Sequence, residues 1–128
     1  MKILLDTHCF IWWDSEPDKL SARALALCED PANELTLSVA SLWEVQIKES
    51  LGKITLSAPI RQLVAGQQNS NGMVVMPVHA RHVYEIAALP KVHGDPFDRI
   101  LIAQARVEGM CLLSHDAVMR KYPVDVEW

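Results

Sequence analysis

The stretch "KILLDTH", residues 2–8, places a short apolar run directly ahead of an acid. Residues 2–5 are too few for a helix but suit a buried strand, which then ends at Asp6. The same arrangement returns in "CLLSHD", residues 111–116. The sequence thus predicts two strands, each with an acidic side chain close to its carboxyl end.

Further strands and helices alternate along the chain. Strands are expected at residues 34–38 and 73–78, with a last edge strand at 124–128. Helical spacing and end signals predict helices at 8–13, 20–30, 38–52, 58–68, 80–89, 96–109 and 117–122. Short apolar strands between helices are typical of a parallel sheet covered on both faces. Ligand sites in such sheets form at the carboxyl ends of the strands.

Composition limits the class of protein. The 128 residues are 50% hydrophobic and 22% charged, which fits one globular domain over residues 1–128. The net charge of −4 does not exclude a nucleic-acid partner, because the acidic residues can be gathered in one place and neutralised by a metal. It does not favour such a partner either, since no run of Lys and Arg forms a basic patch. Three widely spaced cysteines indicate reduced, buried thiols in a cytoplasmic protein. We expect no signal peptide, and no apolar run approaches the roughly 18 residues of a membrane span.

Four acids are predicted to meet at one edge of the sheet. Asp6 and Asp116 follow strands, while Glu44 and Asp98 lie on helices that start at that same edge. Carboxylates so close together would repel one another unless a cation neutralises them. Oxygen ligands without histidine or thiolate suit Mg²⁺ or Mn²⁺, and such an ion can activate water and orient a phosphate. Phosphodiester hydrolysis is the reaction that fits this site best.

Each acid also has a structural interpretation. Asp6 could cap the helix that follows it. Glu44 could pair with Lys48, four residues further along the helix. Asp98 could stabilise a helix N-terminus, and Asp116 could be a turn residue. Taken singly, each acid is more often structural, so the hypothesis of a metal site rests on their common position.

The chain resembles the PIN domains, and within them the VapC-type toxin ribonucleases whose sequences share "LLDTH…W" and "HGDPFDR" patterns. The stretches that carry this resemblance are "LLDTHCFIWW" (4–13), "SVASLWEVQIKESLGKI" (38–54), "LPKVHGDPFDRILIAQA" (89–105) and "LLSHDAVMRKYPVDVEW" (112–128). It implies a PIN-like three-layer α/β/α domain with a short, mostly parallel central sheet flanked by helices.

The resemblance also implies roles for individual residues. The metal-binding and catalytic acids are Asp6, Glu44, Asp98 and Asp116. Asp95 is either a fifth acid at the rim or a cap for the helix that presents Asp98. The hydroxyls of Thr7 and Ser114 are expected to position the acids.

Basic and aromatic residues near these motifs stay open to two interpretations. Lys48 and Arg99 either contact substrate phosphates or pair with Glu44 or Asp95. His8 and His93 are ligands or proton donors, or else make structural hydrogen bonds. His93 is also a candidate for substrate contact. The tryptophans are expected in the core or at a dimer interface; they are Trp12, Trp13 and Trp43.

The implied protein is a Mg²⁺- or Mn²⁺-dependent endoribonuclease, the toxin of a type II toxin–antitoxin pair. The resemblance adds RNA as substrate, a small cognate antitoxin that blocks the site, and a homodimer. Two alternatives are a catalytically inactive PIN-like binding module and a metal-dependent phosphatase. A phosphatase would need an aspartate pair two residues apart, whereas the residue two after Asp6 is His8.

Overall fold

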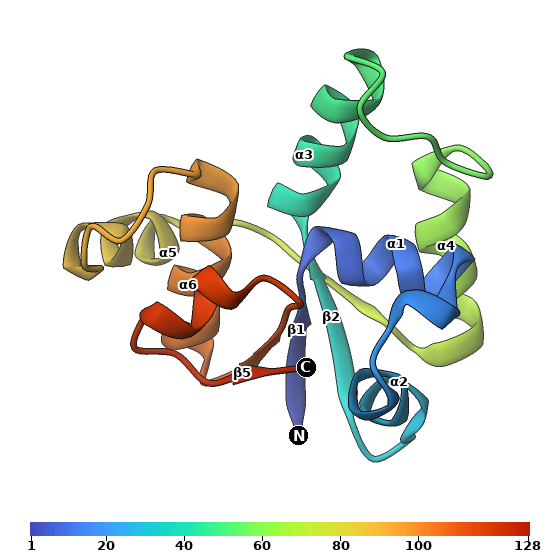
Figure 1. The fold of residues 1–128 in the computed structure, drawn as a ribbon, viewed down its shortest axis with the longest axis horizontal. Helices are drawn as coiled ribbons and strands as arrows, with labels where there is room; N and C mark the ends of the chain where they lie inside the picture. The colour runs from blue at the N-terminus through green and yellow to red at the C-terminus, as the bar shows by residue number, and fades with distance from the viewer.

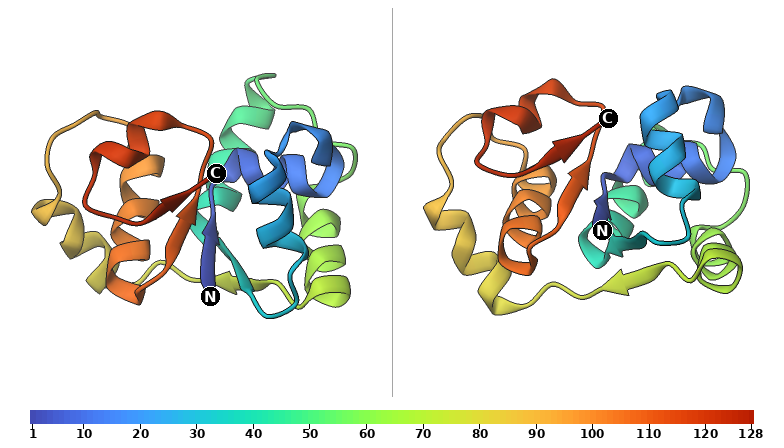
Figure 2. Two further views of the ribbon diagram at one scale, coloured as in Figure 1. Left: turned by 60° about the horizontal axis from the view of Figure 1, so that its bottom comes forward. Right: turned by 90° about the horizontal axis from the view of Figure 1, so that it is seen from below.

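The computed structural model describes residues 1–128 and contains one five-stranded sheet. Its strands are β1 (Lys2–Leu5), β2 (Glu34–Ser38), β3 (Val74–Met76), β4 (Cys111–Leu113) and β5 (Val126–Glu127). Their order is β3-β2-β1-β4-β5, and every neighbouring pair is parallel. The predicted sheet is therefore confirmed, and it is parallel throughout (Figures 1 and 2).

The helices follow the predicted order with small differences at their ends. They are α1 (Thr7–Ser15), α2 (Ala22–Glu29), α3 (Val39–Ser50), α4 (Ile60–Asn71), α5 (Ala80–Glu85) and α6 (Pro96–Glu108). Helix α4 runs past the predicted end at residue 68, to Gly72 in the left-handed conformation (φ 65°). The short helix predicted at residues 117–122 is a 3₁₀ helix over residues 117–121, and a 3₁₀ turn at 86–88 follows α5.

Alternating side chains of β1 divide the core into two parts. Ile3 and Leu5 lie in a cluster with residues of α1, α2 and α4. Leu4 faces the other way and packs in a second cluster with Leu101 and Ile102 of α6. Helices thus cover both faces of the sheet, with α5 packed against α6 (Figure 1). The expected three-layer fold is confirmed.

The strand order creates a crevice at one place on the sheet edge. The chain proceeds from β1 to β2 and β3 on one side, whereas β4 and β5 lie on the other side of β1. Such a reversal leaves an opening beyond the carboxyl ends of the two strands that flank it, here β1 and β4. Helix α3 contacts both α1 and α6 near this edge. None of the helices is long and apolar enough to cross a membrane.

Candidate active site

A cavity of about 450 Å³ contains all five predicted acids. Its lining residues come from the ends of β1 and β4, from α1 and α3, and from the start of α6. They are Asp6, His8, Cys9, Trp12, Glu44, Lys48, Asp95, Asp98, His115 and Asp116. The structure thus brings together acids that are up to 110 residues apart in sequence, because Asp6 and Asp116 both line this cavity.

Asp6 directly follows β1 and is hydrogen-bonded to the neighbouring strand β4. Its backbone N–H donates to Leu113 O of β4 (3.0 Å), so the ladder between the strands continues into the site. Its Oδ2 accepts a 2.6 Å hydrogen bond from the Ser114 hydroxyl, and only 8% of the residue is exposed. Burial raises the pKa of the Asp6 carboxyl, with a further increase from the Glu44 charge, while Ser114 and His8 oppose the shift. Asp6 is the N-cap residue of α1, and its backbone carbonyl accepts from Phe10 N, but its side chain makes no capping hydrogen bond.

Glu44 is held from two directions. Thr7 donates its hydroxyl proton to Glu44 Oε1 at 2.6 Å, and the Ser41 hydroxyl lies 3.0 Å from that of Thr7. Lys48 Nζ lies 2.6 Å from Glu44 Oε2, one helical turn away. Glu44 is 4% exposed, so the ammonium of Lys48 supplies the counter-charge that a buried carboxylate needs.

Asp98 enters the cavity from the first turn of α6. Its Oδ2 lies 2.9 Å from His93 Nε2. Burial raises the pKa of Asp98 to about 6, opposed by the hydrogen bond from His93 and reinforced by the charges of Asp95 and Asp6. At neutral pH this carboxylate is ionised at a cost in free energy.

Asp95 and Asp116 each cap a helical segment while lining the cavity. Asp95 Oδ1 accepts from the backbone N–H groups of Phe97 and Asp98, at 2.9 and 3.0 Å. Asp116 Oδ1 accepts from Val118 N at 3.0 Å and fixes the start of the 3₁₀ segment. Capping of this kind uses one carboxylate oxygen, so the second oxygen of each acid keeps its capacity as a ligand.

The donor set fits a hard divalent cation that retains part of its water shell. Five carboxylates line the cavity with one lysine beside them. Burial raises the pKa of the Cys9 thiol, so this residue remains a neutral thiol and offers no thiolate ligand. No three His, Cys, Asp or Glu side chains are arranged to hold an ion directly. Mg²⁺ readily retains several waters, so these carboxylates would hold such an ion partly through bridging waters.

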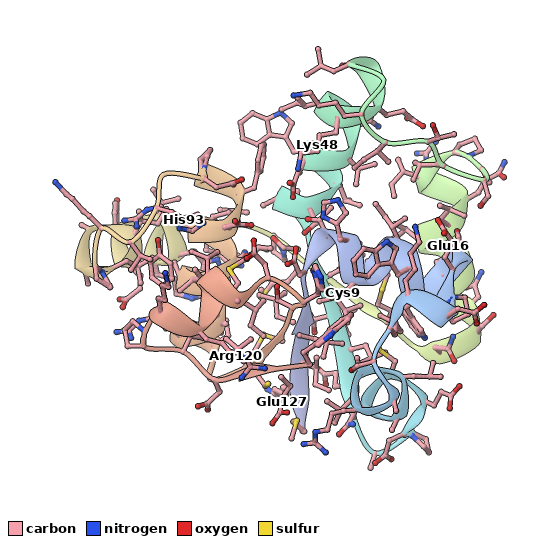
Figure 3. All side chains as sticks on the ribbon, viewed as in Figure 1. Cys9, Glu16, Lys48, His93, Arg120 and Glu127 are labelled. Atoms are coloured by element: carbon pink, nitrogen blue, oxygen red, sulfur yellow. The ribbon has the colours of Figure 1, made fainter.

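The basic candidates take separate positions. Lys48 lines the cavity and pairs with Glu44. Figure 3 shows Lys48 on α3. Arg99 does not line it: the guanidinium donates to Pro90 O (2.9 Å) and to the Tyr122 hydroxyl (3.1 Å). The structure shows no ion pair of Arg99 with Glu44 or Asp95, and the contact of Arg99 with a substrate phosphate stays a prediction.

The two histidines also differ. His8 lines the cavity beside Asp6. His93, which lies on the segment that precedes α6 (Figure 3), is not among the lining residues. Its ring hydrogen-bonds Asp98 in the first turn of α6. Of the roles considered for His93, the structure shows the hydrogen bond to Asp98, and a substrate contact stays a prediction.

The three tryptophans predicted in the core or at a dimer interface lie in different surroundings. Trp13 packs partly buried against the core, as expected. Trp12 packs there too, but it also lines the cavity, with its ring 5.4 Å from that of His115. Trp43 is 65% exposed and meets Phe97 edge-on at 5.3 Å. Trp43 is therefore not a core residue, which leaves the interface interpretation.

Three residues near the acids were not predicted: Ser41, His115 and Tyr122. Tyr122 is 4% exposed, and its hydroxyl lies 2.6 Å from His93 Nδ1. A serine one helical turn before Glu44 was a usable signal for Ser41. No local pattern marks Tyr122, because its partner is 29 residues away.

Comparison with known proteins identifies the class that this fold and cavity define. A family model described as "PIN domain" matches residues 3–125. The chain therefore belongs to the PIN-domain family.

One relative within this family is similar to nearly the whole chain. Ribonuclease VapC22 of Mycobacterium tuberculosis (strain ATCC 25618 / H37Rv) is 30% identical over 121 residues, which cover 94% of this chain and 91% of that protein. The resemblance to VapC-type PIN domains predicted from the sequence is thus confirmed.

Two solved structures share the fold at low sequence identity. VapBC2 from Rickettsia felis, bound to a DNA fragment from its promoter, matches with a TM-score of 0.69 and 15% identity, covering 99% of this chain and 98% of that chain. DNA-bound VapBC from Salmonella typhimurium matches with a TM-score of 0.68 and 14% identity, covering 99% and 97%.

Proposed function

We propose that this PIN-domain protein is a Mg²⁺- or Mn²⁺-dependent endoribonuclease and the toxin of a type II toxin–antitoxin pair. The observation that carries the proposal is the cavity in which five carboxylates from separate segments gather beside one lysine. The similarity to a protein named as a VapC ribonuclease supports RNA as the substrate.

The acids that would hold the ion are Asp6, Glu44, Asp98 and Asp116, with Asp95 at the rim. When bound, the ion supplies an activated water and charge stabilisation for hydrolysis of a phosphodiester. Ser114 and Thr7 each direct a hydroxyl at one carboxylate oxygen, which fixes Asp6 and Glu44 in the cavity. Fixed ligands need little reorganisation when charge develops in the reaction.

Lys48 is the residue we assign to the substrate phosphate. Its side chain is 29% exposed and its ammonium has three donors, of which the bond to Glu44 uses one. The remaining donors are available to a phosphate oxygen at the mouth of the cavity. Arg99 has no part in this assignment.

An antitoxin partner is proposed from the charge of the same cavity. A small protein that places a cationic side chain among the carboxylates would neutralise them and exclude both ion and RNA. VapBC complexes are among the structures that share this fold, which supports a partner of that kind. RNA and such a partner both fit a cytoplasmic protein.

Metal removal tests the function. We expect the purified chain to cleave total RNA in the presence of Mg²⁺ or Mn²⁺ and to lose this activity in EDTA. The circular dichroism spectrum should stay unchanged in EDTA, because the core clusters contain no acid of the cavity. Restoring Mg²⁺ should restore the activity. Cleavage at an equal rate in EDTA would contradict the proposal, and unfolding in EDTA would indicate a structural ion.

A homodimer is proposed for the apolar groove between α3, α5 and α6. The groove is lined by Val39, Ala40, Trp43, Val78, Val83, Pro96, Phe97 and Ile100. Large contiguous apolar surfaces are uncommon on monomers. Since α3 and α6 also carry Glu44 and Asp98, a second copy on this groove would brace both acids.

Trp43→Asp tests this interface. We expect the wild-type chain to sediment at twice its 14.4 kDa mass and the variant at 14.4 kDa, because a buried charge without a partner strongly opposes association. Leu51→Asp is the matched control, since Leu51 is 62% exposed but does not line the groove. A monomeric wild type, or a Trp43→Asp dimer, would exclude this groove as the interface.

A further inference from the structure

A chain of hydrogen bonds leads from the interior of the protein to one of the cavity acids. His93 lies in the middle of it, with Nε2 2.9 Å from Asp98 Oδ2 and Nδ1 2.6 Å from the Tyr122 hydroxyl. Neither Tyr122 nor His93 lines the cavity. The hydrogen-bonded connection of these two residues to the cavity runs through Asp98.

The partners of His93 determine which ring nitrogen carries the proton. An ionised carboxylate only accepts, so Nε2 must be the nitrogen that donates to Asp98. In the neutral ring Nδ1 is then the acceptor, and it requires a donor. The Tyr122 hydroxyl is the group that supplies this donor.

The direction of the Tyr122 hydroxyl is also fixed by its surroundings. Its oxygen accepts from Arg99 Nη1 at 3.1 Å and from the His93 backbone N–H at 3.2 Å. The other acceptor available to its proton is His93 O at 3.4 Å, much farther than Nδ1. Arg99 is itself held by Pro90 O. The hydroxyl proton of Tyr122 is therefore donated to Nδ1 of His93.

We propose that Tyr122 and His93 are positioning residues that fix Asp98 as a metal ligand. Tyr122 holds the imidazole ring, the ring holds Asp98 Oδ2, and Oδ1 remains for the cavity. This inference rests on the proposed function, because it assigns Asp98 a role at the ion. It also accounts for the "HGDPFDR" motif: His93 holds Asp98, Asp95 caps its helix, and Arg99 holds Tyr122.

The ring nitrogens of His93 give a direct test in the metal-free protein. A long-range ¹H–¹⁵N spectrum at pH 7.5 should show the Nε2–H tautomer with Nδ1 shifted upfield as a hydrogen-bonded acceptor. In Tyr122→Phe the Nδ1 signal should move downfield, because the ring has lost its donor. A wild-type Nδ1–H tautomer, or an Nδ1 signal that is the same in both proteins, would overturn the inference.

Metal affinity supplies the second readout. Residues that orient a metal ligand typically change affinity by about 10- to 100-fold when removed. We therefore expect Tyr122→Phe to weaken Mn²⁺ binding, measured by calorimetry, by about 10-fold. Tyr84→Phe is the matched control, because Tyr84 is 75% exposed on α5 and should leave the affinity unchanged.

A double-mutant cycle separates positioning from general loss of packing. In a His93→Ala background, Tyr122→Phe should have no further effect on Mn²⁺ affinity, because the connection to Asp98 is already broken. His93→Gln should recover part of the affinity, since its amide can still donate to Asp98, and it gives a readout even if Tyr122→Phe folds poorly. An equal loss in both backgrounds would overturn the inference.

Asp98→Asn distinguishes failure of the inference from failure of the proposed function. If Asp98→Asn weakens Mn²⁺ binding and RNA cleavage while Tyr122→Phe changes neither, the inference alone fails. If Asp98→Asn changes neither property, Asp98 is not a ligand and the proposed site fails as well.

Discussion

Asp6→Asn is expected to lower the rate of metal-dependent RNA cleavage by more than about 100-fold, which is the upper range found for residues that only support a metal ligand. Asparagine keeps the shape of the side chain and can still accept the bond from Ser114. It lacks the negative charge that attracts the cation. The change therefore affects the chemistry of the site and not its architecture.

The measurement is a single-turnover cleavage rate with saturating Mg²⁺, accompanied by a melting curve. Because burial raises the pKa of Asp6, the ionised carboxylate destabilises the fold, and Asp6→Asn should melt at a higher temperature without metal. Asp18→Asn, at an exposed acid outside the cavity, should change neither property. An Asp6→Asn variant that cleaves RNA at the wild-type rate would remove Asp6 from the proposed site.

Asp98→Asn is expected to stabilise the metal-free protein by about 1–3 kcal/mol at pH 7. The pKa of Asp98 is about 6 in the fold against an ordinary value of 3.8. Between these values the folded protein binds more protons than the unfolded chain, so stability falls as pH rises through this window. The full free-energy cost of ionising Asp98 in the fold is present above about pH 6 and is absent below the unfolded pKa of 3.8. The stability of Asp98→Asn relative to the wild type should therefore rise between these two pH values.

Urea unfolding in EDTA between pH 4 and pH 8 measures this difference. The two proteins should be about equally stable near pH 4 and diverge toward pH 7. Added Mg²⁺ should reverse the order, because the ion binds the wild-type carboxylate more tightly and stabilises the folded state. A stability difference that does not depend on pH would show that burial of the Asp98 charge is not its cause.

The fold could be predicted from the sequence because each strand carries its own signal. Residues 3–5 and 112–113 are buried on both faces of the sheet, so they form continuous apolar runs. Helix ends were less certain. The polar residues after Gly66 carry no apolar periodicity, yet α4 continues through them to Asn71. The stop at Gly72 depends on a left-handed backbone, which other residues rarely adopt.

The position of the acids followed from topology, whereas the directions of individual side chains did not. Acids after β1 and β4 had to lie at one edge once the strands were parallel. Arg99 is next to Asp98 in the sequence, but its guanidinium reaches Pro90 and Tyr122. That path depends on the loop between residues 89 and 95, whose shape comes from tertiary packing. The exposure of Trp43 could not be predicted either. A large apolar side chain on a helix indicates burial, but it does not indicate whether the covering residues belong to the same chain or to a partner.

The bond between Ser114 and Asp6 spans 108 positions of the chain. During translation, β1 emerges early but can pair with β4 only after residues 111–113 have left the ribosome. Contacts so distant in sequence form late and slowly. A nascent chain that ends before Asp116 therefore lacks part of the proposed centre, so the proposed cleavage of RNA requires residues up to Asp116 to have left the ribosome.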